Sequence, residues 1–207
     1  SSLFKRIKKL EPGYILEGSL LDHNISLRTI PYWSVEEDYL SPIIERSESS
    51  RDLEECLKEV ISEQLITDRP LGAFLSGGID SSLICSLAKE IQPQIDTFSM
   101  GYEDESFSEL KKSRLVAETL GTNHTEIIFR EKDILEVIPV IPKTYDEPFA
   151  DQSQIPTLLL TKLAREAGNI VCLTGDGGDE LFGGYNRHRN IKLFLTFKLF
   201  FKALNNL

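Results

Sequence analysis

Residues 71–82 read LGAFLSGGIDSS, a short apolar run followed at once by a turn built of serine and glycine. The apolar run predicts a buried strand over 71–75, and residues 81–91 carry apolar side chains at the spacing of a helix. Between them, Gly77 and Gly78 allow a tight turn whose backbone N–H groups face outward, because no Cβ obstructs them. The unpaired N–H groups and the positive dipole end of the helix then point at the same spot. The segment predicts an anion site at a strand–turn–helix corner.

Asp80 places a carboxylate beside this predicted anion site. Because a carboxylate repels an anion, we expect a divalent cation to bridge Asp80 to phosphate oxygens. The phosphate-binding pattern Gly-x-x-x-x-Gly-Lys-[Ser/Thr] is absent, and the turn contains no lysine. The alternative interpretation is an ordinary corner with a Ser/Asp helix cap.

The composition restricts the classes of function that the chain can have. With 207 residues, of which 41% are hydrophobic and 27% charged, it can bury one substantial core with an appendage. The net charge of −10 argues against a nucleic-acid-binding surface. An anionic nucleotide would have to be held by backbone amides, a helix dipole and a metal. The three cysteines lack CxxC spacing and indicate small core residues in a reducing, cytoplasmic compartment; no signal peptide is expected.

The closing stretch, residues 191–204, is rich in Leu and Phe. Lysines interrupt it, and it is shorter than the roughly 20 uncharged residues that a membrane-spanning helix needs. A basic amphipathic surface helix is one interpretation. The favoured one is a core helix whose packing partners lie further along a longer chain.

Residues 1–34 differ in pattern from the rest of the chain. Strand-like segments near 14–17 and 26–30 predict a β-hairpin, which is too small to form a core and should pack on something else. Residues 35–50 are acidic and serine-rich and predict a linker.

From residue 51 onward, helical and strand-like patterns alternate. Helices are expected at 51–67, 81–91, 108–120, 132–141 and 153–167, and strands at 71–75, 95–100, 123–129 and 169–174. This order predicts an α/β fold with a mostly parallel sheet covered by helices on both faces. Ligands of such sheets bind outside the carboxyl ends of the strands. If the strands at 71–75 and 169–174 are neighbours, the glycine-rich turns that follow them meet at one crevice.

The second of these turns, residues 174–185, reads TGDGGDELFGGY. Five glycines in a dozen residues lose much backbone entropy on folding and are hard to explain as structure alone. Asp176, Asp179 and Glu180 repel one another unless a cation or a substrate ammonium group lies among them. A flexible acidic loop or a weak calcium site is the alternative, although EF-hand spacing is absent.

LSGGIDSS, followed later by TGDGGDELFGGYNRH, resembles the synthetase domain of the glutamine-hydrolysing asparagine synthetase family. TFSMGYEDESFSE, VAETLGTNHTE and YDEPFADQSQIPT also look like stretches of that family. The resemblance implies an adenine nucleotide α-hydrolase-like fold. It also makes residues 1–34 the end of an Ntn-type glutaminase domain, 35–50 a linker, and 51–207 the first part of the ATP-binding domain.

The activity that the resemblance implies is an ATP-dependent amide-forming ligase of asparagine biosynthesis. The side-chain carboxylate of aspartate would attack ATP to give an acyl-AMP and pyrophosphate, and ammonia from glutamine would then displace AMP. ATP and Mg²⁺ are the implied cofactors; aspartate, ammonia or glutamine and ATP are the substrates. No nucleic acid or membrane partner is implied, and a homodimer is left open. An amidotransferase acting on another carboxylate and an inactive nucleotide-binding fragment are the alternatives.

Site residues carry over where the motifs match. Pyrophosphate and Mg²⁺ would be held by Ser76, Gly77, Gly78, Asp80, Ser81 and Ser82, and adenosine would be framed by Phe74, Met100, Thr174 and Gly175. Asp176 and Asp179 would be catalytic, Asp80 and Asp179 would bind metal, and Glu180 and Glu109 would bind the substrate. Residues 145–147 would shape the crevice wall. Some relatives have Glu at the position of Asp176, which leaves the acceptor acid open.

Two features of the family are not found in this sequence. Residue 1 is Ser where the glutaminase domain begins with a nucleophilic cysteine, and a catalytic lysine of the family lies beyond position 207. We therefore expect a fragment that is inactive alone and binds nucleotide weakly.

Overall fold

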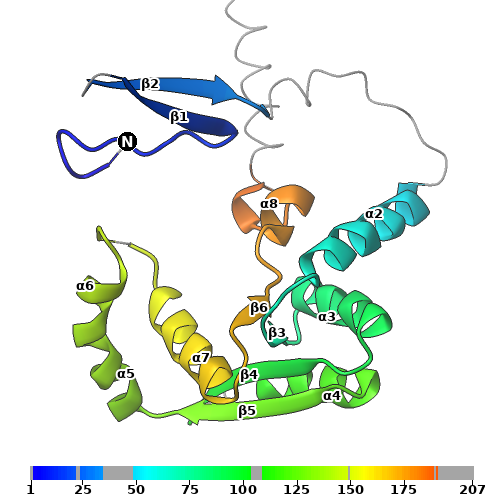
Figure 1. Cartoon of the computed structure of the whole chain (residues 1–207). Helices are drawn as coiled ribbons and strands as arrows, with labels where there is room; N and C mark the ends of the chain where they lie inside the picture. The colour runs from blue at the N-terminus through cyan, green and yellow to red at the C-terminus, as the bar shows by residue number, and fades with distance from the viewer. Residues whose placement is uncertain are drawn as a thin grey trace, which may run out of the picture. The chain divides into compact units, whose positions relative to one another are not determined.

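The computed structural model describes residues 2–21, 24–34, 49–103, 109–148, 150–188 and 190. The chain divides into two compact units, Ser1–Ser49 and Ser50–Leu207 (Figure 1). Most of the expected linker, residues 35–48, and the whole expected closing helix at 191–204 lie outside the described residues. No helix in the described ranges is long and apolar enough to span a membrane.

The first unit contains the expected hairpin, formed by antiparallel strands β1 (Tyr14–Leu21) and β2 (Asn24–Pro31). Gly13 closes its open end, because the amides of Tyr32 and Trp33 both donate to the Gly13 carbonyl, at 2.8 and 3.3 Å. A Cβ on Gly13 would lie 2.1 Å from the Trp33 carbonyl oxygen, so only glycine fits there.

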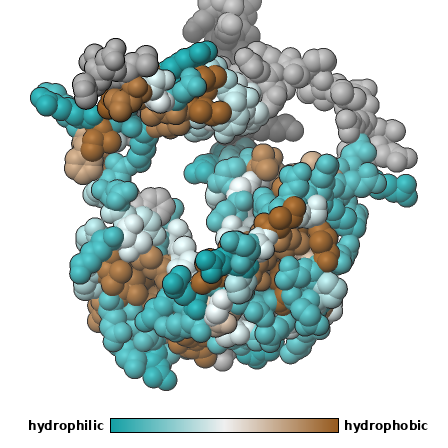
Figure 2. Space-filling view, in the orientation of Figure 1, coloured by the Kyte–Doolittle hydropathy of each residue, from teal (hydrophilic) through white to brown (hydrophobic). Residues whose placement is uncertain are grey.

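One face of this hairpin is apolar. The register pairs Leu20 with Ile25 and Gly18 with Leu27, and side chains two residues apart share a face. Leu16, Leu20, Ile25 and Leu27 therefore lie together, and all four are exposed; Figure 2 shows hydrophobic colour over these strands. No residue that the structure describes in this unit covers this face.

The second unit alternates strands and helices in the expected order. Its helices are α2 (Ser49–Gln64), α3 (Ile79–Ile91), α4 (Leu110–Leu120), α5 (Glu131–Val137), the 3-10 turn η2 (Ile138–Val140), α6 (Ile141–Thr144), α7 (Gln154–Glu166) and α8 (Gly178–Phe182). Its strands are β3 (Leu71–Phe74), β4 (Asp96–Tyr102), β5 (Asn123–Phe129) and β6 (Val171–Leu173).

One expected helix is divided in the structure. The segment expected as a single helix over 132–141 runs as α5, then η2, then α6, with a proline at the start of each of the last two. Pro139 and Pro142 lack the N–H that a continuous helix requires, so each begins a new short helical segment. Residues 142–144, which follow the helix expected at 132–141, consequently belong to α6.

The four strands form one parallel sheet in the order β5–β4–β3–β6. The chain moves outward from β3 to β5 through α3 and α4, then returns through α7 to β6 on the other side of β3 (Figure 1). Right-handed crossovers therefore place α3 and α4 on one face and α7 on the opposite face. The α/β fold expected from the sequence is confirmed, and β3 and β6 are direct neighbours.

The core lies between β3, α3 and α2, around the buried side chains of Ile61, Leu75 and Cys85. Burial raises the pKa of the Cys85 thiol to about 12, as suits an inert core residue. Cys172 is half-buried, and burial raises its pKa to about 11. The expectation of a core position is wrong for Cys56, which is exposed. The apolar face of α2 is wider than the part that the core covers.

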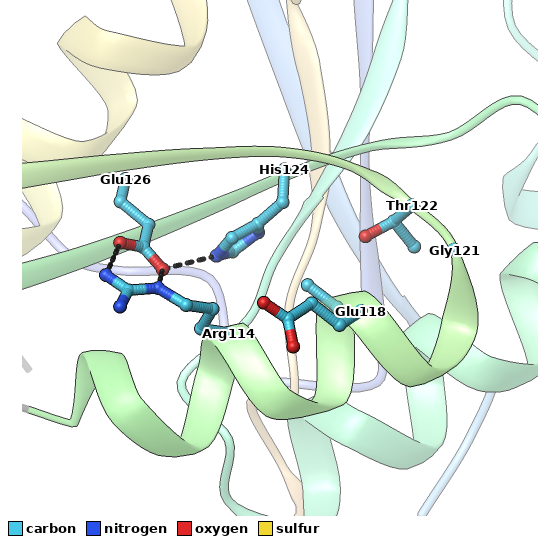
Figure 3. Close-up of a pocket in the computed structure, with 7 residues that line it drawn as sticks. Arg114, Glu118, Gly121, Thr122, His124 and Glu126 are labelled. Carbon is cyan, nitrogen blue, oxygen red and sulfur yellow. Dashed lines mark hydrogen bonds and ion pairs between the residues drawn. The ribbon is translucent and has the colours of Figure 1, made fainter.

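A polar cluster joins α4 to the edge strand β5 (Figure 3). His124 Nδ1 lies 2.8 Å from Thr97 Oγ1, which lies 2.7 Å from Thr122 Oγ1. His124 Nε2 lies 3.5 Å from Glu126 Oε1, and Arg114 donates to both Glu126 oxygens, at 3.1 and 2.6 Å. Arg114, Thr122, His124 and Glu126 line a hollow of about 420 Å³. Because the Arg114 and Glu126 charges satisfy each other, we interpret the cluster as structural.

This cluster predicts a pH-dependent stability. Burial lowers the pKa of His124 below its ordinary 6.5, although the Glu126 carboxylate opposes the shift. The unfolded chain therefore binds more protons just below pH 6.5, and the stability contribution of His124, fully present above that pH, is lost as the pH falls. In thermal unfolding from about pH 7.5 to about pH 5.5, we expect His124→Gln to reduce the pH slope of Tm. An unchanged slope would contradict this role.

Candidate functional site

The turn after β3 is held by two serine hydroxyls. Ser76 Oγ and Ser81 Oγ lie 2.9 Å apart, and the amides of Ser76 and Gly78 each donate to one of them, at 3.2 Å. Gly78 caps the N-terminus of α3 without any side-chain hydrogen bond. Within the described chain, the amides of Ile79 and Asp80 reach no acceptor. A pre-shaped turn with free donors at a helix start is suited to an anion.

Gly77 fixes this turn against the start of α4. Its φ is +77°, a left-handed conformation that favours glycine. A Cβ added there would lie 2.6 Å from Lys112 Cβ and 2.7 Å from the Ser113 amide nitrogen. The turn and the first residues of α4 therefore touch without space for any side chain between them.

The turn after β6 packs on the turn after β3. A Cβ on Gly175 would lie 2.7 Å from the amide nitrogen of Ser81. A Cβ on Gly178 would lie 2.6 Å from Asp80 Cγ and 2.7 Å from its Oδ1. The two glycine-rich segments, far apart in sequence, thus meet at the carboxyl ends of adjacent parallel strands, as expected for a crevice there.

A pocket of about 700 Å³ opens between these turns, β4 and α7. Most of the predicted site residues line it: Phe74, Ser76, Gly78, Asp80, Ser81, Met100, Glu109, Thr174, Gly175, Asp176 and Asp179. Gly77 is not part of the lining. The buried Ser82 hydroxyl, which finds no partner in the described chain, is also absent from it. Glu180 lines a smaller adjoining hollow of about 310 Å³.

The pocket lining is strongly acidic. Four carboxylates contribute to it, from Asp80, Glu109, Asp176 and Asp179, whereas Lys112 is the one basic residue among the described lining. Thr174 Oγ1 donates to Asp176 Oδ2 at 3.0 Å and accepts from the Asp176 amide at 3.3 Å, which orients this carboxylate. Such a site favours a bound cation.

The carboxylate side chains of the pocket fit a magnesium ion whose remaining ligands are phosphate oxygens and waters. No group of three or more His, Cys, Asp or Glu side chains is placed to hold a metal in the described ranges. Mg²⁺ is usually held by one or two carboxylates, with phosphate oxygens and waters completing the shell. Asp80 and Asp179 line the same pocket and have no ion pair among the described residues, so they remain the predicted ligands.

The Glu180 side chain accepts a hydrogen bond from another side chain of the same segment. The Tyr185 hydroxyl donates to Glu180 Oε1 at 2.6 Å, which lowers the pKa of Glu180 and raises that of Tyr185. The Arg187 guanidinium lies 4.1 Å from the centre of the Tyr185 ring, and the His188 ring packs edge-on to it. This network stiffens the segment that follows the second turn.

One wall of the pocket was not predicted from the sequence. It is formed by Ser153, Pro156, Thr157 and Leu160 at the start of α7, whereas the predicted wall residues at 145–147 are absent from the described lining. The four positions follow the i, i+3, i+4, i+7 spacing of one helix face, which is a readable signal. Lys112 was missed because only the fold brings α4 to the turn.

The family model described as asparagine synthase matches residues 52–202. The chain belongs to the asparagine synthase family. The resemblance seen in its two glycine-rich motifs is thereby confirmed. In this chain, the contact between the turns brings those two motifs together at one pocket.

Relatives from distant organisms agree with this assignment. The chain is 34% identical over 192 residues to asparagine synthetase [glutamine-hydrolyzing] 1 of Bacillus subtilis (strain 168), covering 91% of this chain and 29% of that protein. It is 35% identical over 141 residues to asparagine synthetase [glutamine-hydrolyzing] 1 of Arabidopsis thaliana, covering 62% of this chain and 24% of that protein. The chain thus spans less than a third of the length of these two relatives.

A solved structure of glutamine-dependent NAD+ synthetase from Acinetobacter baumannii, in complex with ADP, gives a TM-score of 0.48 with this chain. Its sequence identity is 19%, and the match covers 78% of this chain and 32% of that one.

Because the two turns contact each other at Gly175 and Gly178, we expect any side chain at these positions to destabilise the fold. Gly175→Ala and Gly178→Ala should each lower the free energy of unfolding by about 1–3 kcal/mol, because the new Cβ overlaps Ser81 or Asp80. Gly78→Ala is the control, since its Cβ would meet only Ser76 Oγ, at 3.3 Å; its cost should stay below about 1 kcal/mol. Urea unfolding measures all three, and equal stabilities would refute the contact.

Proposed function

We propose that the second unit binds ATP between the two turns and uses it to activate a carboxylate for amide formation. The observation that supports this most directly is the contact between the turns. Because of this contact, the free amides of the first turn and the carboxylates of both turns lie around one pocket. Family membership supports the same reaction class.

The phosphate groups of ATP would lie on the turn after β3. The amides of Ile79 and Asp80 and the positive end of α3 face that place, and the Ser76 and Ser81 hydroxyls border it. Asp80 and Asp179 would hold Mg²⁺ against the same phosphates. The ion would offset the phosphate charge that the carboxylates otherwise oppose.

The nucleoside would occupy the remainder of the pocket. Phe74, Met100, Thr174 and Gly175 line it, as the proposed adenosine contacts should. Pro156 and Leu160 of α7 add apolar surface on the opposite wall. The volume of about 700 Å³ falls within the range of pockets that enclose a small molecule.

The proposed reaction has two steps. The side-chain carboxylate of aspartate attacks the α-phosphorus, its oxygen bonds to phosphorus, and pyrophosphate leaves. Ammonia derived from glutamine then attacks the acyl carbon, and AMP leaves with the oxygen. Asp176, held by Thr174, would orient the acyl group, and Asp179 would face the ammonium group of the amino acid. The chain contributes positioning and charge neutralisation.

The first unit fits a role as the end of a glutaminase domain. The apolar face formed by Leu16, Leu20, Ile25 and Leu27 needs a covering surface, which the earlier strands of such a domain would provide. In this proposal residues 35–50 link the glutaminase domain to the ATP-binding domain, and residues 51–207 form part of the ATP-binding domain.

Binding of the nucleotide is tested by Asp80→Ala. Loss of a carboxylate that helps to hold Mg²⁺ should weaken MgATP binding by about tenfold or more, measured by isothermal titration of the full chain. Asp68→Ala, an exposed carboxylate outside the pocket, should bind as the unchanged protein does. Identical titrations for Asp80→Ala and the unchanged protein would remove the turn from the proposal.

The chemical step is tested by Asp176→Asn. Because the chain is expected to have little activity alone, the readout is the residual pyrophosphate release with ATP, aspartate and ammonia. This residual release should fall by about 100-fold in the variant, while MgATP binding is retained. Mass spectrometry of the products identifies the acceptor acid. Release with a different carboxylate would point to another amidotransferase, and binding without release in the unchanged chain would leave a nucleotide-binding module.

A further inference from the structure

The proposed phosphate site has a charge problem that Mg²⁺ alone does not remove. Four carboxylates line the pocket, and the turn itself contains no lysine or arginine. An ATP phosphate chain adds several negative charges to that surface. One divalent ion offsets only part of the total, so a further cation close to the turn would favour binding.

Lys112 is placed to supply that cation. Its Cβ lies 2.6 Å from the position that a Gly77 Cβ would take, and the amide nitrogen of the neighbouring Ser113 lies 2.7 Å from it. The Lys112 amide donates to the Glu109 carbonyl at 3.0 Å, which fixes this residue in the first turn of α4. The base of the side chain is therefore set against the outer surface of the phosphate turn.

The charged end of this side chain is available to a ligand. Lys112 is exposed, it contributes to the pocket lining, and its ammonium group has no hydrogen-bond or ion-pair partner in the described part of the chain. The adjacent Lys111 does engage in an interaction and does not contribute to the lining. Of the two neighbouring lysines, only Lys112 combines a fixed base with a free charge at the site.

We infer that Lys112 binds the outer phosphates of a nucleoside triphosphate, or of the departing pyrophosphate, and so replaces the lysine that the turn lacks. The inference rests on the proposed function. A lysine ammonium on a four-carbon stem is a mobile point charge suited to phosphate oxygens. Because Gly77 has no side chain, the stem can lie directly along the turn. Lys112 would thus favour triphosphate over monophosphate ligands.

The test compares three variants of the full chain by titration with magnesium pyrophosphate, MgATP and AMP. Lys112→Gln should weaken magnesium pyrophosphate and MgATP by about tenfold and leave AMP affinity unchanged. The affinity of Lys112→Gln for these two ligands should also decrease less with salt concentration than that of the unchanged chain. Lys112→Arg should restore most of the affinity, and the matched control Lys111→Gln should bind all three ligands as the unchanged chain does.

Three other results are possible, and each contradicts either the role of Lys112 or the proposed function. Equal pyrophosphate affinity in Lys112→Gln and the unchanged chain would overturn the role of Lys112 and leave the proposed function standing. An equal loss of AMP and pyrophosphate affinity would show that Lys112 only supports the turn. If the unchanged chain binds neither MgATP nor magnesium pyrophosphate, the proposed function fails and this inference fails with it.

Discussion

The contact of Gly175 and Gly178 with Ser81 and Asp80 is the constraint on which the site depends. It exists because β3 and β6 are paired in parallel, so that the segments leaving both strands emerge at the same end of the sheet. Backbone approach this close excludes any side chain on either glycine. It also directs the Asp80 carboxylate toward the second turn, where Asp176 and Asp179 border the same pocket. The acidic character of the site is therefore a product of strand order as well as of composition.

The turn after β3 is confined from a second side by α4. Gly77 adopts a left-handed conformation against Lys112 and Ser113, so the turn after β3 lies between α4 and the turn after β6. A turn restrained on both sides loses little further freedom when an anion binds, which lowers the entropic cost of binding. The hydroxyl pair of Ser76 and Ser81 adds a third restraint inside the turn.

Much of this could be predicted from the sequence, because the decisive signals are local. The alternation of periodicities predicted the α/β order, and the two glycine-rich segments predicted the two turns that border the pocket. The errors occur where local pattern gives no three-dimensional information. Pro139 and Pro142 divide a helix that hydrophobic spacing alone leaves continuous, and Cys56 has the right helical phase but lies beyond the area that the core covers. Lys112 is the clearest case, since a lysine early in an amphipathic helix is indistinguishable from an ordinary surface residue until α4 packs on Gly77.

The hairpin described for the first unit has a practical consequence. Its two strands expose an apolar face made of Leu16, Leu20, Ile25 and Leu27, and a two-stranded ribbon also has outer edges with unpaired amides and carbonyls. Such a ribbon invites intermolecular strand addition during recombinant production. A shorter polypeptide that begins near Arg51 would omit this apolar surface and keep every residue that lines the pocket between the two turns, which makes it the better starting point for crystallisation.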